Sequence, residues 1–174
     1  MHPYKLPVRL MSKKIKLLFM DIDGTLTDGK IYMSSQGELF KSFDVKDGFG
    51  IHDLLPQAGI VPVILTSRES AIVQNRCREL GIDLCYQGCR NKEAKLIELA
   101  SEFGLCSDKQ GIYWEIAYIG DDIIDLPCMR RCGLVGCPAD AVDAVKMLAH
   151  YVSTKNGGSG AAREFIEYII GLKE

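Results

Sequence analysis

The chain has 174 residues, of which 47% are hydrophobic and 25% charged, with a formal net charge of −2. This composition is ordinary for a globular protein, and the length suits one domain with a proper hydrophobic core. The sequence has no basic tract, so we expect no nucleic-acid partner. No apolar run approaches the ~18 residues that a membrane span needs, so we expect no membrane partner either.

Residues 1–14 carry positive charge but lack the long apolar core of a signal peptide. We therefore interpret them as a short N-terminal leader, within which Met11 is a possible natural start, and residues 15–174 as a single domain. The seven cysteines form no Cys-x-x-Cys pair. We expect reduced, buried thiols and a cytoplasmic protein, although a zinc site at their four-residue spacings is conceivable.

The first predicted element is a strand at residues 15–20, which leads into the acidic turn DIDGT. Asp21 and Asp23 are two residues apart, so in an extended chain their side chains point the same way, at the edge where open α/β sheets bind ligands. Two carboxylates this close repel each other unless a cation lies between them, and hard oxygen ligands suit Mg²⁺. The turn therefore predicts phosphate chemistry around magnesium; the alternative is an ordinary surface turn.

A β-hairpin is predicted at residues 30–43, where two β-prone runs flank the link Ser34-Ser35-Gln36-Gly37. The hairpin has many apolar residues for an exposed ribbon: Ile31, Tyr32, Met33, Leu39, Phe40 and Phe43. Exposed apolar edges of this kind usually pair with a partner. Self-association is the natural hypothesis, with packing on its own domain as the alternative.

Helices and short buried strands alternate through the rest of the chain. We expect helices at 51–57, 69–80, 92–103, 123–131, 141–149 and 161–172, and strands at 60–65, 84–86, 116–119, 134–135 and 151–152. This alternation indicates βαβ units, and therefore an α/β fold with a parallel sheet and helices on both faces. The hairpin stands where a larger cap could have been inserted and is too small to be one.

Polar residues end several of the predicted strands. Thr66, Ser67 and Arg68 follow the strand at 60–65, and the segment GDDIID follows the strand at 116–119. In a parallel sheet all carboxyl ends lie on one side, so these groups can converge with the acidic turn on one crevice. Lys92, at the start of a predicted helix, can join them or be an ordinary solvated lysine.

The segments DIDGT, LTS, Lys92 and GDDIID resemble, in the right order, the four motifs of the haloacid dehalogenase (HAD) superfamily. More narrowly, DGKIYMSSQGELFKSFDVKDGFGI, LTSRES, YQG-x-x-NK and GGSGAAREF are similar to its capless subgroup that hydrolyses 3-deoxy-octulosonate 8-phosphate. Close relatives act on nine-carbon keto-sugar acid phosphates or form the C-terminal part of acylneuraminate cytidylyltransferases. The resemblance implies a Rossmann-like HAD fold, a Mg²⁺ cofactor and a phosphorylated sugar acid as substrate.

The resemblance also implies roles for individual residues. Asp21 would be the nucleophile, Asp23 the general acid and base, and Thr66 and Lys92 the groups that hold the phosphoryl oxygens. The metal ligands would be Asp21, the backbone carbonyl of Asp23, and Asp121. Asp122 or Asp125 would hold a metal-bound water or a neighbouring backbone group.

By the same resemblance, a further set of residues would contact the substrate. Its members are Asp23, Asp44, Val45, Lys46, Asp47, Gly48, Arg68, Arg76 and Lys92. The planar fork of an arginine suits a carboxylate; the alternative of an exposed helix charge stays open for Arg68 and is favoured for Arg76. His52 and Ser67 depart from the octulosonate pattern, which has arginine and glycine there, so the identity of the sugar stays open.

The subgroup further implies a homotetramer with its hairpins at the centre and with C-terminal segments that cover a neighbour's active site. Gly157, Gly158 and Gly160 would let such a tail bend, and Arg163 would offer charge to the substrate; the alternative is a turn before an ordinary helix. The main prediction is a Mg²⁺-dependent sugar-acid phosphatase. The alternatives are a nine-carbon phosphatase, a non-catalytic companion of a cytidylyltransferase, and a phosphotransferase, which usually needs a cap to exclude water.

Overall fold

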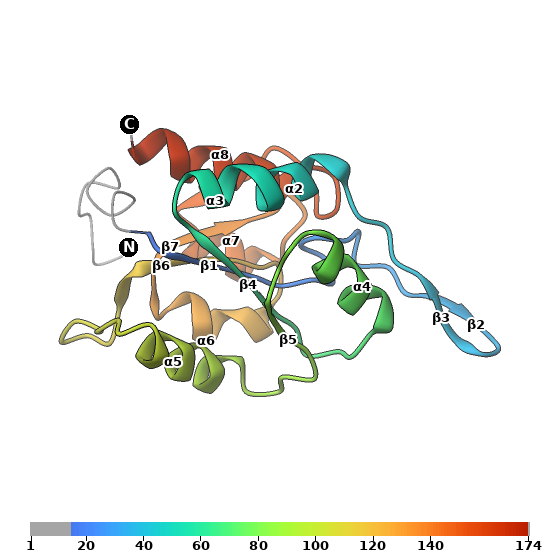
Figure 1. Cartoon of the computed structure of the whole chain (residues 1–174), viewed down its shortest axis with the longest axis horizontal. Coiled ribbons are helices and arrows are strands. Elements are labelled where there is room, and N and C mark those ends of the chain that lie inside the picture. Colours follow the sequence, from blue (N-terminus) through green and yellow to red (C-terminus); the bar gives the residue numbers. More distant parts are fainter. Residues whose placement is uncertain (1–14, 174) are drawn as a thin grey trace.

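A six-stranded parallel sheet in the order β5-β4-β1-β6-β7-β8 forms the centre of the computed structural model, which describes residues 15–173 (Figure 1). The strands are β1 (Leu17–Met20), β4 (Val61–Leu65), β5 (Leu84–Tyr86), β6 (Tyr113–Ile119), β7 (Cys132–Cys137) and β8 (Tyr151–Val152). Strand β1 pairs in parallel with β4 and with β6, so three carboxyl ends meet at the middle of one edge. The predicted leader at residues 1–14 lies outside the described residues.

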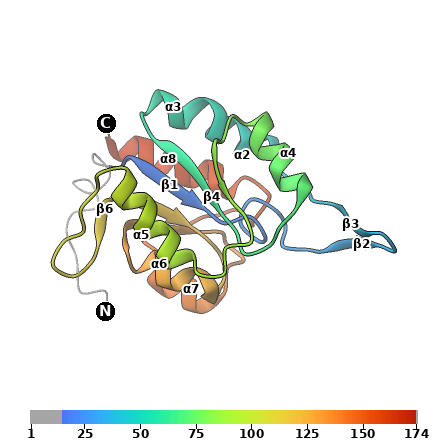
Figure 2. The same ribbon diagram turned by 60° about the horizontal axis from the view of Figure 1, so that its bottom comes forward.

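Helices cover both faces of this sheet (Figures 1 and 2). One face is covered by α2 (Val45–Phe49), the π-helix η1 (Gly50–Leu54), α3 (Leu55–Gln57), α4 (Ala71–Glu79) and α8 (Ala161–Lys173), and the other by α5 (Lys92–Glu102), α6 (Leu126–Met129) and α7 (Asp143–Leu148). Successive side chains of a strand point to opposite faces. Accordingly Leu18 packs into the first core and Leu17 into the second, both fully buried. The predicted Rossmann-like α/β fold, with a parallel sheet and helices on both faces, is confirmed.

Several element bounds differ from the prediction. The helix expected at 51–57 begins at Val45, where the Asp44 side chain caps it by accepting from the Lys46 amide. Glycines disfavour helices, and Gly48 hides this start in the sequence. A Cβ at Gly48 would lie 2.5 Å from an Arg76 guanidinium nitrogen, so a larger residue here would displace the end of the Arg76 side chain. The helix expected at 123–131 is shorter and consists of the 3₁₀-helix η2 (Ile123–Asp125) followed by α6.

The predicted hairpin forms a separate two-stranded sheet of β2 (Tyr32–Ser34) and β3 (Gly37–Phe40). It projects away from the body of the domain in both views (Figures 1 and 2). Three of its apolar side chains do not pack on the domain, because Ile31, Met33 and Leu39 are 56–61% exposed, whereas Phe43 packs against the core. The hairpin therefore offers an apolar surface at a distance from the core.

The glycines near the C-terminus have a different role from the predicted hinge. The Gly158 amide donates to the Thr25 carbonyl, and a Cβ on Gly157 would lie 1.9 Å from the Gly24 carbonyl oxygen. The loop is therefore packed against the acidic turn of its own chain, and α8 after it is fixed by the fully buried Phe165. These glycines allow a close approach of two backbones and do not form a flexible tail.

All seven cysteines are free thiols, as expected. Cys77, Cys128, Cys132 and Cys137 are buried, whereas Cys106 is exposed. Burial raises the pKa of Cys137 to about 11 and that of Cys128 to about 12, so these thiols are protonated and behave as small hydrophobes. Within residues 15–173, no helix has the length and apolar character needed to cross a membrane.

Candidate active site

The acidic turn begins directly after β1 and depends on a glycine at its centre. Gly24 has a φ of +91°, and a Cβ there would lie 2.1 Å from Asp121 Oδ2. Glycine therefore lets Asp121, which follows β6, lie directly against the turn. The Thr25 hydroxyl donates to Asp121 Oδ1 at 2.9 Å and fixes this approach. The two predicted acidic strand ends thus meet as one site.

Lys92 joins the site from the first turn of α5. Its ammonium nitrogen lies 2.8 Å from Asp21 Oδ1 and 2.8 Å from Asp125 Oδ1, and only 3% of its side chain is exposed. Burial alone would lower the pKa of Lys92, but the two carboxylates raise it above its ordinary value. Lys92 is therefore a protonated, buried cation and not a solvated surface lysine.

Asp125 organises the loop after β6, a role that the sequence left open between Asp122 and Asp125. Besides the bond from Lys92, its carboxylate accepts from the Tyr118 hydroxyl at 2.7 Å and from the Asp121 amide at 3.2 Å. Asp125 is fully buried, and these bonds use both of its oxygens. It therefore holds Lys92 and the backbone of Asp121 in place.

Carboxylate oxygens of Asp21, Asp121 and Asp125 lie within 4.8 Å of one another. Burial, reinforced by repulsion from Asp125, raises the pKa of Asp21 even though Lys92 opposes the shift. Burial also raises the pKa of Asp121 to about 6. This grouping of carboxylates is costly without a cation and is typical of a metal site.

Asp122, which was predicted to join the metal site, lies outside this cluster. Its side chain is exposed, and its Oδ1 accepts from the Ile123 amide at 2.7 Å, so it caps η2. Asp122 and Asp125 form a reciprocal capping box at this point. The exposed carboxylate is therefore used to start a helix, and the buried one supports the site.

Asp23 lies in a cluster of charges that the sequence analysis did not predict. Lys41 contacts Asp23 Oδ1 directly, and the Arg68 Nε lies 3.8 Å from Asp23 Oδ2. Glu38 pairs with Lys41 at 3.1 Å and lies 3.7 Å from the Arg68 guanidinium. Glu38 and Lys41 come from the hairpin, whose base therefore forms one wall of the site. Nothing local in the sequence marks these two residues, because their partners follow from the tertiary fold.

Thr66 and Ser67 lie at the end of β4, beside β1. Thr66 is 2% exposed, with its amide bonded to the Tyr86 carbonyl. The Ser67 hydroxyl donates to the Cys89 carbonyl at 3.2 Å. The serine that departs from the octulosonate pattern is thus used to join two loops, while Arg68 after it is exposed and stays close to Asp23.

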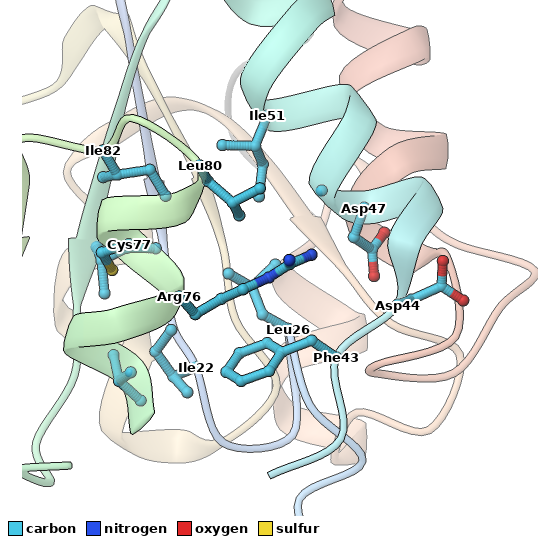
Figure 3. Close-up of a pocket in the computed structure, with 13 residues that line it drawn as sticks. Ile22, Leu26, Phe43, Asp44, Asp47, Ile51, Arg76, Cys77, Leu80 and Ile82 are labelled. Carbon is cyan, nitrogen blue, oxygen red and sulfur yellow. The ribbon is translucent and has the colours of Figure 1, made fainter. Parts of the chain in front are cut away.

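Four of the remaining predicted substrate residues line a pocket between α2 and α4: Asp44, Asp47, Gly48 and Arg76. Figure 3 shows Arg76 extending from α4 towards α2 across this pocket, with Phe43 beside it. The Arg76 guanidinium lies 5.6 Å from the Phe43 ring centre and pairs with Glu79 at 2.9 Å. Arg76 is therefore a half-buried group and not the exposed helix charge considered from the sequence. Its Nε has no hydrogen-bond partner among the described residues.

Asp47 borders the same pocket, but its carboxylate is already engaged. It accepts from the Gly160 and Arg163 amides at 3.3 Å and 2.7 Å and so caps the start of α8. Burial raises its pKa to about 6. Arg163, predicted to offer charge to a substrate, pairs with Glu167 at 2.7 Å.

Asp44, Val45, Lys46 and His52 also belong to this side of the molecule. Asp44 accepts from the Lys46 amide at 2.6 Å, and Val45 is 82% exposed. His52 is exposed and lies 3.2 Å from Asp53. The predicted substrate residues therefore form two groups, one with Arg68 beside the acidic turn and one around Arg76.

No protein-family model matches the chain. The 3-deoxy-D-manno-octulosonate 8-phosphate phosphatase KdsC of Escherichia coli is 38% identical over 168 residues, which are 97% of this chain and 86% of the relative. The phosphatase of that name from Moraxella catarrhalis, solved with magnesium, phosphate and KDO, has a TM-score of 0.87 and 37% identity, covering 97% of this chain and 93% of its own. The cobalt-bound deoxy-D-mannose-octulosonate 8-phosphate phosphatase (YrbI) of Haemophilus influenzae has a TM-score of 0.86 and 37% identity, covering 94% and 91%.

Proposed function

The chain belongs to the family of 3-deoxy-D-manno-octulosonate 8-phosphate phosphatases, and we propose that it hydrolyses that sugar acid phosphate with Mg²⁺ as cofactor. The observation that carries this proposal is the position of Lys92 2.8 Å from Asp21, beside Asp121 at the carboxyl edge of the sheet. This arrangement combines a nucleophile, a fixed cation and metal ligands. It supports a hydrolase over a non-catalytic companion, which has no need to keep it.

The carboxylates fit a magnesium ion. Asp125 has both oxygens occupied by hydrogen bonds, whereas the contacts of Asp21 with Lys92 and of Asp121 with Thr25 each involve Oδ1. Asp21 and Asp121, with the backbone carbonyl of Asp23, would hold the ion. When bound, magnesium supplies positive charge that favours ionised Asp21 and neutralises a phosphate.

In the first chemical step, a carboxylate oxygen of Asp21 attacks phosphorus and the bond from phosphorus to the sugar oxygen breaks. Asp23 gives its proton to the departing alkoxide, so the sugar leaves as an alcohol. Lys92 and Thr66 stabilise the charge on the phosphoryl oxygens during this transfer. The product on the enzyme is an aspartyl-phosphate, which divides one difficult displacement into two easier ones.

In the second step, a water molecule attacks the phosphorus of the aspartyl-phosphate. Asp23, now ionised, takes the proton from this water, and the bond between phosphorus and Asp21 breaks. Inorganic phosphate leaves, and both aspartates return to their starting states. The same residue acts as acid and then as base, which requires its carboxylate to stay in one place.

Arg68 is the residue that we infer to hold the substrate's carboxylate. Its side chain is 42% exposed and lies near Asp23 without a close contact, so it is free to form a bidentate pair with the ligand. The nine-carbon alternative rests on His52, which stands where the octulosonate enzymes have an arginine. This chain therefore lacks the fixed positive charge of that arginine. Arg76, half-buried beside Phe43, is available on the same side of the molecule to replace that charge.

We also propose a homotetramer in the cytoplasm. The projecting hairpin supplies exposed apolar side chains for assembly, including Met33 and Leu39. The free thiols suit a reducing compartment.

The test is a phosphate-release assay with Mg²⁺ on eight- and nine-carbon keto-sugar acid phosphates, using the wild type and Asp21→Asn. We expect the wild type to prefer the eight-carbon ester and the variant to lose at least ~1,000-fold in kcat. The variant should keep its melting temperature, because replacing Asp21 removes a buried carboxylate beside Asp125. A wild type that binds Mg²⁺ and assembles but hydrolyses neither ester would establish the non-catalytic alternative.

A further inference from the structure

Lys41, at the base of the hairpin, directly contacts the acid/base residue of the proposed reaction. We propose that Lys41 is a positioning residue, which with Glu38 fixes the Asp23 carboxylate in the orientation that proton transfer requires. This inference rests on the proposed phosphatase function and goes beyond it, because it gives the hairpin a part in the chemistry. Its physical basis is a buried cation shared between two carboxylates.

The burial of Lys41 distinguishes it from an ordinary surface ion pair. Only 3% of its side chain is exposed, and its ammonium contacts Asp23 Oδ1 as well as Glu38 Oε1, the latter at 3.1 Å. A buried ammonium is costly unless it is paired and hydrogen-bonded. Lys41 is therefore held tightly by its two partners, and it holds them in return.

Glu38 connects this pair to the body of the domain. The Ser70 hydroxyl donates to Glu38, and the same hydroxyl caps α4 by accepting from the Val73 amide at 3.4 Å. Burial would raise the pKa of Glu38, but the hydrogen bonds from Ser70 and Lys41 lower it below its ordinary value. Glu38 is thus an anionic anchor between the hairpin and α4, and Lys41 extends from that anchor to Asp23.

The two oxygens of Asp23 have different surroundings. Lys41 contacts Oδ1, whereas the nearest cation to Oδ2 is the Arg68 Nε at 3.8 Å, beyond hydrogen-bond distance. One oxygen is therefore fixed, and the other remains available to exchange a proton with the leaving group or with water. Without Lys41 the carboxylate, which is 24% exposed, would be free to rotate out of reach.

The test compares two kinds of phosphate ester, because they depend differently on Asp23. The sugar acid phosphate has an alkoxide leaving group that needs a proton, whereas p-nitrophenyl phosphate has a stable aryloxide leaving group that needs none. The ratio kcat/KM reports the steps up to departure of the leaving group. Misplacement of Asp23 should therefore lower kcat/KM for the sugar ester and leave that for the aryl ester nearly unchanged.

We expect Lys41→Met to lower kcat/KM for the sugar ester by ~10- to 100-fold. The loss should be in kcat, with KM nearly unchanged. For the aryl ester, kcat/KM should change by less than about threefold. Lys41→Arg should restore most of the activity, because it keeps the charge. Lys30→Met is the matched control, since it removes an exposed lysine from the other side of the same hairpin. It should behave like the wild type on both esters.

Equal losses on the two esters would overturn the proposal, because they indicate general damage to the site. A rise in KM alone would also overturn it, since Lys41 would then bind the substrate. If Lys41→Met does not fold, Glu38→Gln provides the same comparison. It should lower kcat/KM for the sugar ester by less than Lys41→Met would and leave that for the aryl ester unchanged. Equal losses on the two esters in Glu38→Gln would contradict the proposal. A wild type that hydrolyses neither ester would instead refute the phosphatase function itself.

Discussion

Lys92 Nζ lies 2.8 Å from Asp125 Oδ1, in a place where both side chains are almost completely buried. Because Lys92 also contacts Asp21, Asp125 determines where the cation stands relative to the proposed nucleophile. Asp125 holds the Asp121 amide as well. One carboxylate that does not react therefore fixes both the phosphate-binding cation and the second acidic strand end.

Replacing Asp125 by alanine should destabilise the protein and inactivate it. Lys92 would keep Asp21 as its partner, but the Tyr118 hydroxyl and the Asp121 amide would lose their acceptor, which costs about 1–3 kcal/mol for each group left unsatisfied. The free energy of unfolding from a denaturant titration measures this cost, and phosphate release measures the activity. Asp83→Ala, at an exposed carboxylate, is the control and should change neither quantity. Wild-type phosphate release by the Asp125→Ala variant would show that Asp125 does not position Lys92.

Gly24→Ala should weaken metal binding while leaving the fold intact. A methyl group at this position would lie 2.1 Å from Asp121 Oδ2, so Asp121 must move and lose its bond with Thr25. Loss of such a supporting contact typically costs ~10- to 100-fold in metal affinity. Isothermal titration with Mg²⁺ measures the change.

The matched control for Gly24→Ala is Gly59→Ala. Gly59 also has a positive φ, +68°, but a Cβ there meets nothing within 4 Å. This variant should lose about 1 kcal/mol of stability from backbone strain and keep its affinity for Mg²⁺. Equal losses of Mg²⁺ affinity in the two variants would show that strain, and not the clash with Asp121, is responsible.

The parts of the site that the sequence predicted are those set by local patterns. The apolar run before Asp21 requires a buried strand, and Gly24 marks the turn after it, so the acidic turn follows from neighbouring residues alone. The convergence with Asp121 then follows from a general property of parallel sheets. These steps need no knowledge of individual side-chain contacts.

The parts that the sequence missed depend on contacts between distant segments. Lys41 meets Asp23 only because the hairpin leaves the domain and returns beside the turn, and the bonds that accumulate on Asp125 come from two other elements. The start of α2 was missed because Gly48 is a poor helix former, and in the folded chain the Arg76 guanidinium lies against this glycine. Tertiary packing decides each of these cases.

The affinity for Mg²⁺ should fall as the pH is lowered. Burial raises the pKa of Asp121 from 3.8 to about 6 in the metal-free protein. Because the folded value lies above the unfolded one, the stability that the neutral carboxyl contributes is complete below about pH 4 and is lost as the pH rises through about 6. Magnesium binds only the ionised form, so protons compete with it below about pH 6.

The measurement is the melting temperature with and without saturating Mg²⁺ across this range. We expect the increase caused by Mg²⁺ to be large near pH 8 and to vanish near pH 5. In Asp121→Asn the increase should be lost at every pH, whereas Asp143→Asn, at an exposed position of α7, should keep the wild-type profile. An increase that does not depend on pH would show that the buried carboxylates are not the ligands.

The last prediction concerns the exposed apolar side chains of the hairpin. Met33 and Leu39 are 61% and 59% exposed, so packing within the domain does not account for two large apolar side chains at these positions. If they are buried between copies of the chain, each contributes about 1.5–3 kcal/mol to assembly. The double variant Met33→Ser, Leu39→Ser should therefore shift the protein from tetramer towards smaller species in light scattering after size exclusion.

The control for this variant is Met147→Ser, at an 86% exposed methionine on α7 away from the hairpin. It should keep the wild-type mass. Since Glu38 and Lys41 lie at the base of the same hairpin, loss of assembly should also reduce turnover of the sugar ester at low protein concentration, and activity should recover as the concentration rises. A double variant that remains tetrameric, or a wild type that is monomeric, would show that the hairpin does not assemble the enzyme.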